Sequence, residues 1–347
     1  MAKTYAGRKS TADGPERYHS FLRGMGRLAA GRTIHAGIKA IANRSWLLLL
    51  AADNSEMPRS DHVRHIQYGK VRMVLLVTSA SGTNGAGYGK LLAFNDSGQL
   101  LGPFTEDARV SDPRGLGIDS GLLFLNSGSD RILALDSKGR VVRDSGVLPG
   151  LNPGGGNFGP DGRYYVGSRS SRTIVSFAPT LASPGEPLLP PAVVPFPRGF
   201  AFGQDGILFL ASGVGPGGEG DNTILAFGPE RRILKWWKVA DAELSPLDLA
   251  IAPNGNVVVS SEHPFGAPDP VTTIREYDRS NGRLVRVLAS DLLTTFRKPR
   301  GLRFGRDNKL YCVTENEVVA FDFATGKCLG AVARLPSLNG QAVIFFG

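Results

Sequence analysis

Cysteine is scarce in this chain. Only Cys312 and Cys328 occur among 347 residues. The strand pattern described below places them on the second and fourth strands of one sheet. A third strand then separates them by roughly 10 Å, which is beyond the reach of a disulfide. Cysteine usage gives no sign of an oxidising compartment, so we expect a cytoplasmic protein with two free thiols.

The chain also lacks a long hydrophobic run. Its most apolar stretch, WLLLLAA at 46–52, is much shorter than the roughly 20 residues that a membrane helix needs. The stretch lies too far from the first residue to act as a secretion signal, unless translation begins at Met25. We therefore predict no membrane span.

A basic excess is absent from most of the chain, although the formal net charge is +9. Residues 1–72 hold 13 Lys and Arg against 5 Asp and Glu, whereas residues 73–347 hold 27 against 26. The nearly neutral larger part disfavours nucleic acid as a partner. We expect residues 1–72 to form a basic tail, disordered or partly helical, or to lie upstream of the true start.

What the chain does contain is a repeat. Entries of the form Pro-x-Gly, as at Pro113-Arg114-Gly115, precede a short apolar strand, a turn of the Asp-Gly type and further strands. Similar units begin at Pro153, Pro197, Pro246 and Pro299. A period of about 46 residues with short strands and frequent turns is typical of a β-propeller.

Six units fill residues 73–347 and indicate how the ring closes. The first unit begins at its second strand, near Val74, and the chain ends with a spare strand at 338–346. That last strand is expected to become the innermost strand of the first blade, which removes the open edge of the ring. The sequence therefore predicts an all-β, six-bladed propeller over 73–347.

Loops joining the second and third strands emerge on the same face as the inner-strand entries. Three of them are long, at 79–89, 211–222 and 260–271, and the other three are tight. An uneven rim predicts walls around a pocket, because loops on a rigid scaffold often carry function. The alternative is that glycine-rich loops merely tolerate insertion.

Arginine follows the entry proline in every second blade, as Arg114, Arg198 and Arg300, and Asn339 holds that place in blade 1. Three guanidinium groups at one mouth repel each other unless an anion or carboxylates neutralise them. The pattern predicts a pocket for a small anionic molecule, with these four residues binding the substrate. Each Arg could instead pair locally, for example with Asp112.

Acidic and histidine side chains near this face could supply proton transfer. Asp248 belongs to the entry of blade 5, and Glu262 and His263 lie in the loop of the same blade. A histidine and carboxylates over an anion pocket predict general acid and base catalysis. The alternative is that His263 is simply a solvated loop residue.

The units Pro-Arg-Gly-Leu-Gly-Ile-Asp and Pro-Arg-Gly-Phe-Ala-Phe resemble NHL-type repeats. The six-bladed closure is similar to that of the gluconolactonase (senescence marker protein) and strictosidine synthase-like superfamily. That resemblance implies a divalent metal, Ca²⁺ or Zn²⁺, on the axis. Only Asn339 and Asp248 remain as candidate ligands, and Arg114, Arg198 and Arg300 oppose a cation. We therefore predict no cofactor.

Two functions stay open at this stage. The first is a monomeric hydrolase or lyase, lactonase-like, that acts on a small anionic metabolite. The second is a non-catalytic NHL-type platform that binds a protein, peptide or other ligand on the same face. A platform would depend on its rim and on Trp236 and Trp237, which we expect on the outer strand of blade 4, one facing a neighbouring layer and one facing solvent.

Overall fold

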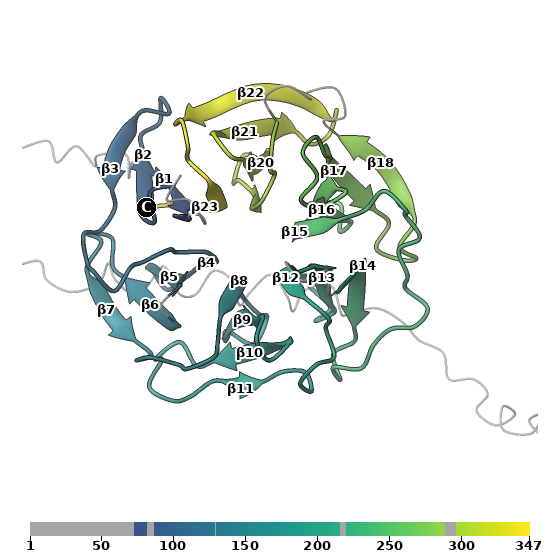
Figure 1. Cartoon of the computed structure of the whole chain (residues 1–347), viewed down its shortest axis with the longest axis horizontal. Coiled ribbons are helices and arrows are strands. Elements are labelled where there is room, and N and C mark those ends of the chain that lie inside the picture. The colour runs from purple at the N-terminus through teal and green to yellow at the C-terminus, as the bar shows by residue number, and fades with distance from the viewer. Residues whose placement is uncertain (1–72, 82–86, 129, 216–219, 289–295) are drawn as a thin grey trace, which may run out of the picture. The chain divides into compact units, whose positions relative to one another are not determined.

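The computed structural model describes residues 73–81, 87–128, 130–215, 220–288 and 296–347. Its described residues form 23 strands and no helix. The strands build six sheets that stand around a central channel like the blades of a propeller (Figure 1). The predicted all-β, six-bladed architecture is confirmed. The predicted tail at 1–72 lies outside the described residues, so its nature stays a prediction.

Each blade is an antiparallel sheet whose strands run from the channel outward. Blade 1 comprises β23 (Gly340–Phe346), β1 (Val74–Ser79), β2 (Leu91–Phe94) and β3 (Leu100–Pro103); blade 2 comprises β4 (Leu116–Asp119), β5 (Leu122–Ser127), β6 (Arg131–Leu135) and β7 (Val141–Asp144); blade 3 comprises β8 (Pro153–Phe158), β9 (Tyr164–Ser168), β10 (Thr173–Phe177) and β11 (Glu186–Pro187). Blade 4 comprises β12 (Pro197–Phe202), β13 (Leu208–Val214) and β14 (Gly220–Phe227); blade 5 comprises β15 (Pro246–Ile251), β16 (Val257–His263), β17 (Val271–Tyr277) and β18 (Leu284–Leu288); blade 6 comprises β19 (Leu302–Phe304), β20 (Leu310–Val313), β21 (Glu317–Asp322) and β22 (Lys327–Arg334).

The last strand closes the ring. β23 pairs antiparallel with β1, and the register places Leu76 opposite Ile344 and Val77 opposite Val343. In Figure 1 the yellow end of the chain lies inside the blue strands of the first blade. The predicted closure is confirmed, with the strand beginning at Gly340.

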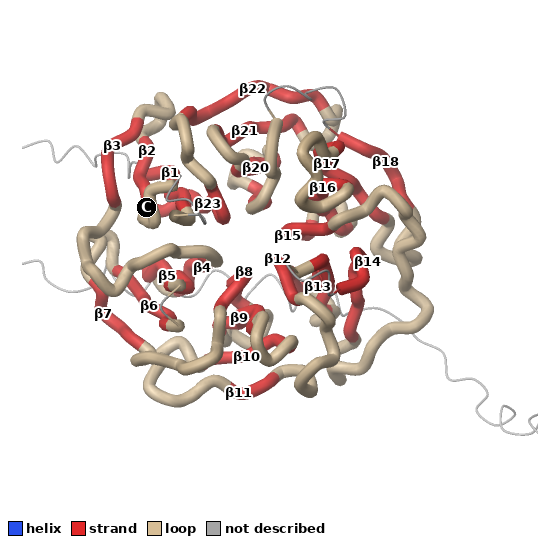
Figure 2. Tube along the Cα trace, viewed as in Figure 1, coloured by secondary structure: helices blue, strands red, loops and turns tan. Residues whose placement is uncertain are grey.

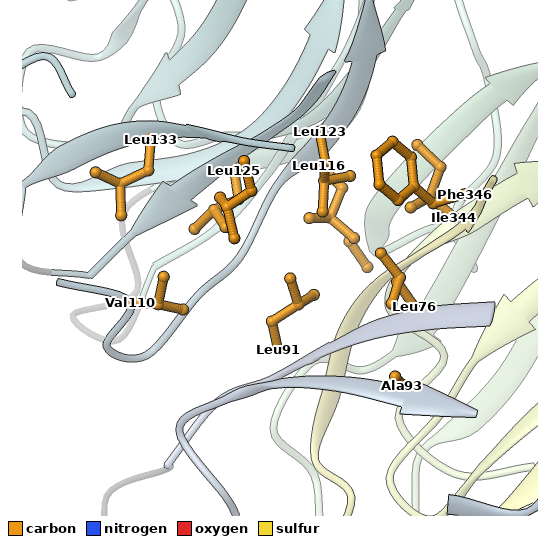
Figure 3. Packing of buried hydrophobic residues seen from close by; sticks show 12 residues of the cluster. Leu76, Leu91, Ala93, Val110, Leu116, Leu123, Leu125, Leu133, Ile344 and Phe346 are labelled. Carbon is orange, nitrogen blue, oxygen red and sulfur yellow. The ribbon is translucent and has the colours of Figure 1, made fainter. Parts of the chain in front are cut away.

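Apolar side chains fill the spaces between neighbouring blades. One cluster joins blades 1 and 2 through Leu76, Leu116, Leu123 and Phe346, and these side chains point toward one another in Figure 3. The expected large residues near the ends of the third strands are all buried: Phe94, Leu135, Phe177, Phe227, Tyr277 and Phe321. Each blade therefore depends on its neighbours for its core.

Glycines of the Pro-x-Gly entries let the inner strands approach one another. A Cβ atom at Gly199 would lie 1.8 Å from Oδ1 of Asp248, and one at Gly301 would lie 2.6 Å from Cα of Ala342. Real Cβ contacts are far longer, so any side chain here would push neighbouring blades apart. The repeated glycine is thus required by the narrow channel.

Blade 4 departs from the prediction. It has three strands within the described residues, and β14 continues into turns drawn as loop in Figure 2. The outer strand expected at Trp236 and Trp237 is therefore wrong. The opposite orientation of the two side chains is confirmed, because Trp237 is buried 5.0 Å from the Phe209 ring whereas Trp236 is 57% exposed.

The two cysteines also lie as predicted. Cys312 is on β20 and Cys328 on β22, and both are free thiols. β21 separates the two strands in the sheet of blade 6.

Candidate functional site

A cavity of about 100 Å³ lies on the axis of the propeller. Inner strands or strand entries of all six blades line it, and they contribute backbone at three consecutive glycines, Gly154, Gly155 and Gly156. Five arginines also line it: Arg114, Arg169, Arg198, Arg300 and Arg303. The channel is therefore narrow and strongly basic.

The three entry arginines converge on this cavity, but they differ in their partners. Arg114 Nη2 lies 3.2 Å from Oδ2 of Asp112, and Arg300 Nη1 lies 3.1 Å from Oε2 of Glu262. Arg198 has no carboxylate partner among the described residues; its Nη2 donates to the Val214 carbonyl at 2.5 Å. Local pairing therefore accounts for two of the three cations and leaves Arg198 uncompensated.

Several guanidinium donors in the channel have nothing to donate to. The Nε–H groups of Arg114, Arg198 and Arg303 are buried and lack a hydrogen-bond acceptor in the described part of the chain. Buried polar groups are nearly always satisfied in folded proteins, by protein atoms, water or a ligand. Such donors around a cavity form a site that is ready for an anion.

The charge balance of the channel points the same way. Burial lowers the pKa of Arg198, and the neighbouring cations Arg300 and Arg169 lower it further. Burial also lowers the pKa of Arg300, although Glu262 opposes this shift. Both shifts mean that the positive charges are destabilised here, so an anion would be attracted.

Two of the channel arginines were missed in the sequence. Arg169 follows β9, and its Nη2 donates to Oδ1 of Asn152 at 2.7 Å. Arg303 lies on β19, and its Nη2 reaches across the channel to the Leu116 carbonyl at 3.1 Å. The only available signal for Arg303 was an arginine within an otherwise apolar inner strand.

Phe265 was also missed, although it contacts two of the entry arginines. The guanidinium carbon of Arg198 lies 4.3 Å from the centre of its ring, and that of Arg300 lies 5.6 Å from it. Phe196 contacts Arg198 at 5.0 Å as well. Aromatic faces stabilise guanidinium groups by cation–π attraction and hold their planes in place. Phe265 therefore orients Arg198 and Arg300.

Asp248 occupies the place that glycine holds in the other Pro-x-Gly entries. Its carboxylate lies in the channel, where Oδ2 accepts a hydrogen bond from the Leu302 amide at 2.9 Å. Burial raises the pKa of Asp248 to about 6, and the Leu302 amide and Arg303 only partly offset this effect. A carboxyl group with such a pKa can donate or accept a proton near neutral pH.

This shift has a testable effect on stability. Because the native pKa of about 6 exceeds the usual 3.8, the native state loses stability as the pH rises from about 4 through 6. Asp248→Asn removes this loss and keeps an acceptor for the Leu302 amide. Urea unfolding should show the variant more stable than the wild type by about 3 kcal/mol at pH 8 and equal to it near pH 4.

Exposed Asp96 supplies the control for this measurement, and Asp96→Asn should leave the stability unchanged at both pH values. A gain from Asp248→Asn that does not depend on pH would contradict the assigned cause.

Glu262 and His263 do not line the cavity. Glu262 is buried on β16 and its carboxylate is engaged by Arg300. His263 follows it on the same strand, and its Nδ1 lies 3.1 Å from Oγ of Ser245. Adjacent strand residues point to opposite faces of a sheet. Of the three predicted acid and base residues, only Asp248 is therefore brought into the channel.

Asn339 lies at the edge of the site. Its amide Nδ2 donates to the Ala80 carbonyl at 3.0 Å, and the neighbouring Gln341 lines the cavity in its place. The predicted binding residue Asn339 thus contacts its own loop in this structure.

The residues of the channel do not fit a divalent cation. Among the described residues, no three Asp, Glu, His or Cys side chains gather where they could hold one. Arg114, Arg198 and Arg300 occupy the strand entries, and Asn339 presents its amide nitrogen to Ala80. Cationic donors repel a metal ion, so no reaction step is assigned to one.

Membrane-spanning helices were searched for in the same residues. None of the described segments is a helix with the length and apolarity to cross a bilayer.

Comparison with known proteins shows the fold. The chain matches no protein-family model and no curated protein. Among solved structures, a propeller in a nidogen/laminin complex is similar, with a TM-score of 0.58, 15% identity and coverage of 79% of this chain and 98% of that one. A gluconolactonase from Xanthomonas campestris gives a TM-score of 0.52 and 15% identity, covering 76% and 86%. A streptogramin B lyase gives 0.51 and 15%, covering 79% and 80%. The fold is thus shared by enzymes and by a propeller seen in a protein complex.

Proposed function

We propose that this protein is a hydrolase or lyase, lactonase-like, that acts on a small anionic metabolite bound at the axial mouth of the propeller. The observation that carries the proposal is the set of buried guanidinium Nε–H groups without an acceptor among the described residues, on Arg114, Arg198 and Arg303, around one cavity. A carboxylate or phosphate group supplies the missing acceptors. The gluconolactonase and lyase neighbours support small-molecule chemistry on this fold.

Each channel residue has a role in this proposal. Arg198, with help from Arg114 and Arg300, binds the anion and stabilises negative charge that develops during the reaction. Asp248 carries the proton, because its pKa of about 6 lets it change state near neutral pH. Glu262 and Phe265 hold the arginines in position.

The test begins with binding. A thermal-shift screen of the full chain against carboxylates, phosphates and lactones should identify anions that raise the melting temperature. At a hundredfold excess over its dissociation constant, a ligand stabilises the folded state by about 2.7 kcal/mol. Positive anions and their esters or lactones then enter turnover assays.

The same site predicts a pH dependence of binding. Below pH 6 Asp248 becomes neutral, so its charge no longer repels an anion held by the nearby arginines. We expect the dissociation constant to fall as the pH drops from 7.5 to 5.5 for an anion whose own charge is constant over that range. Isothermal titration with Asp248→Asn, which should bind equally at both pH values, provides the control.

A second candidate function is a non-catalytic binding platform. The exposed side chain of Trp236 favours it, and so does the neighbour found in a protein complex. Binding of a protein partner that survives loss of Arg198 but not of Trp236, together with an anion screen without a hit, would favour the platform.

A further inference from the structure

The segment after β14 replaces the outer strand of blade 4 with a fixed turn. Leu234 N donates to the Ala226 carbonyl at 2.8 Å, and Trp237 N donates to the Leu234 carbonyl at 3.1 Å. Trp237, Val239 and Leu234 pack into the core between blades 4 and 5. Because these three side chains point inward, the residues between them must point outward.

The outward residues include large apolar side chains. Trp236 is 57% exposed and Ile233 is 47% exposed. A tryptophan in this position leaves a large apolar area in water, although the segment that carries it is anchored. Neither residue lines the axial cavity or the cavity between blades 1 and 6. The two side chains therefore project from a surface rather than line a groove.

The same turn concentrates positive charge. Residues 230–238 contain four basic residues and one acidic residue, Glu230, a balance of +3, whereas 73–347 as a whole has 27 basic against 26 acidic residues. Arg231 is used inside the fold, since its Nη1 donates to the Gly206 carbonyl. Arg232, Lys235 and Lys238 are exposed, and no ion pair of the described residues includes them.

Blade 5 extends this surface. A Cβ atom at Gly282 would lie 2.7 Å from the Lys238 carbonyl oxygen, so the turn that leads into β18 touches the basic segment. Arg283 follows directly and is exposed. We name the resulting surface the rim patch, which consists of Arg232, Ile233, Lys235, Trp236, Lys238 and Arg283.

We propose that the rim patch binds an anionic phospholipid surface. Basic side chains are attracted to acidic headgroups, and a tryptophan with an aliphatic neighbour inserts at the level of the headgroups. The projecting shape suits a flat bilayer better than a peptide, which would need a groove. This inference does not depend on the proposed function of the channel.

The test follows the fluorescence of Trp236 in the full chain. The chain has three tryptophans, Trp46, Trp236 and Trp237, so Trp46→Phe leaves the two of blade 4. Vesicles of phosphatidylserine and phosphatidylcholine with brominated acyl chains should quench the emission of this variant. Adding Trp236→Phe should abolish the quenching, because Trp237 is buried. Bound protein whose emission is not quenched, or quenching that survives Trp236→Phe, would overturn the proposal.

Charge reversal gives a second and independent readout. Lys235→Glu with Lys238→Glu should weaken the quenching titration by at least tenfold, because each basic residue near an anionic surface contributes a factor of about five. Lys138→Glu with Lys327→Glu changes the net charge equally at exposed sites of other blades and should have little effect. This pair also controls for binding by residues 1–72, which is common to all variants. Equal weakening by both pairs, or a response of Trp236 to polyglutamate but not to vesicles, would reject a lipid site.

Discussion

Arg198→Gln is expected to weaken the binding of a small anion to the full chain by about 10- to 100-fold. A hydrogen bond to a charged group contributes about 1.5–3 kcal/mol, and Arg198 is the entry arginine without a carboxylate partner in the described residues. Its charge is therefore the one most available to a ligand. Isothermal titration with the best anion of the screen measures the effect.

Two further variants separate binding from folding. Arg172 is exposed on blade 3, so Arg172→Gln should bind like the wild type. Arg198→Lys keeps a charge without the planar fork, so it should restore only part of the affinity. Because burial and neighbouring cations destabilise Arg198 in the free protein, Arg198→Gln should unfold at the same or a higher temperature. Unchanged affinity in a folded Arg198→Gln variant would refute the anion site.

Removal of the last strand is expected to abolish cooperative folding of the propeller. A chain that ends at Asn339 lacks β23, which pairs with β1 over six residue pairs and supplies Val343, Ile344 and Phe346 to two apolar clusters. Each large apolar residue lost from a core costs about 2–5 kcal/mol, and the total stability of a domain is about 5–15 kcal/mol. Thermal melts followed by circular dichroism should show no sharp transition.

The matched control removes Gly347 alone, which is exposed and lies outside β23. That variant should melt like the wild type. A sharp transition in the longer truncation would mean that the other blades hold the ring together without this closure.

The sequence was sufficient for the ring because local signals repeat in it. The entry glycine recurs where inner strands crowd, as at Gly199 and Gly301, and turn residues separate the strands. Blade 4 was predicted incorrectly because the apolar residues Leu234, Trp237 and Val239 anchor a turn to the core rather than form a strand. Buried apolar residues alone do not distinguish these two cases.

The site was only partly predictable for a different reason. Arg114, Arg198 and Arg300 share a position in the repeat, so their convergence followed from the fold. Arg169, Arg303 and Phe265 reach the channel from other positions, through side-chain length and loop path that no periodic pattern encodes. Glu262 and His263 could have been separated in advance, since neighbouring residues on one strand face opposite ways.

The substitution of aspartate for the entry glycine of blade 5 has a consequence for stereochemistry. Arg114, Arg198 and Arg300 come from alternate blades, so on their own they approximate a threefold arrangement that a phosphate could occupy in three equivalent rotations. Asp248 lies on one side of the axis, between Gly199 and the Leu302 amide. The pseudosymmetry of the ring is thereby broken at the level of the cavity. A bound molecule meets its proton donor or acceptor from one direction only, so a reaction at a prochiral centre in this channel would yield a single stereoisomer.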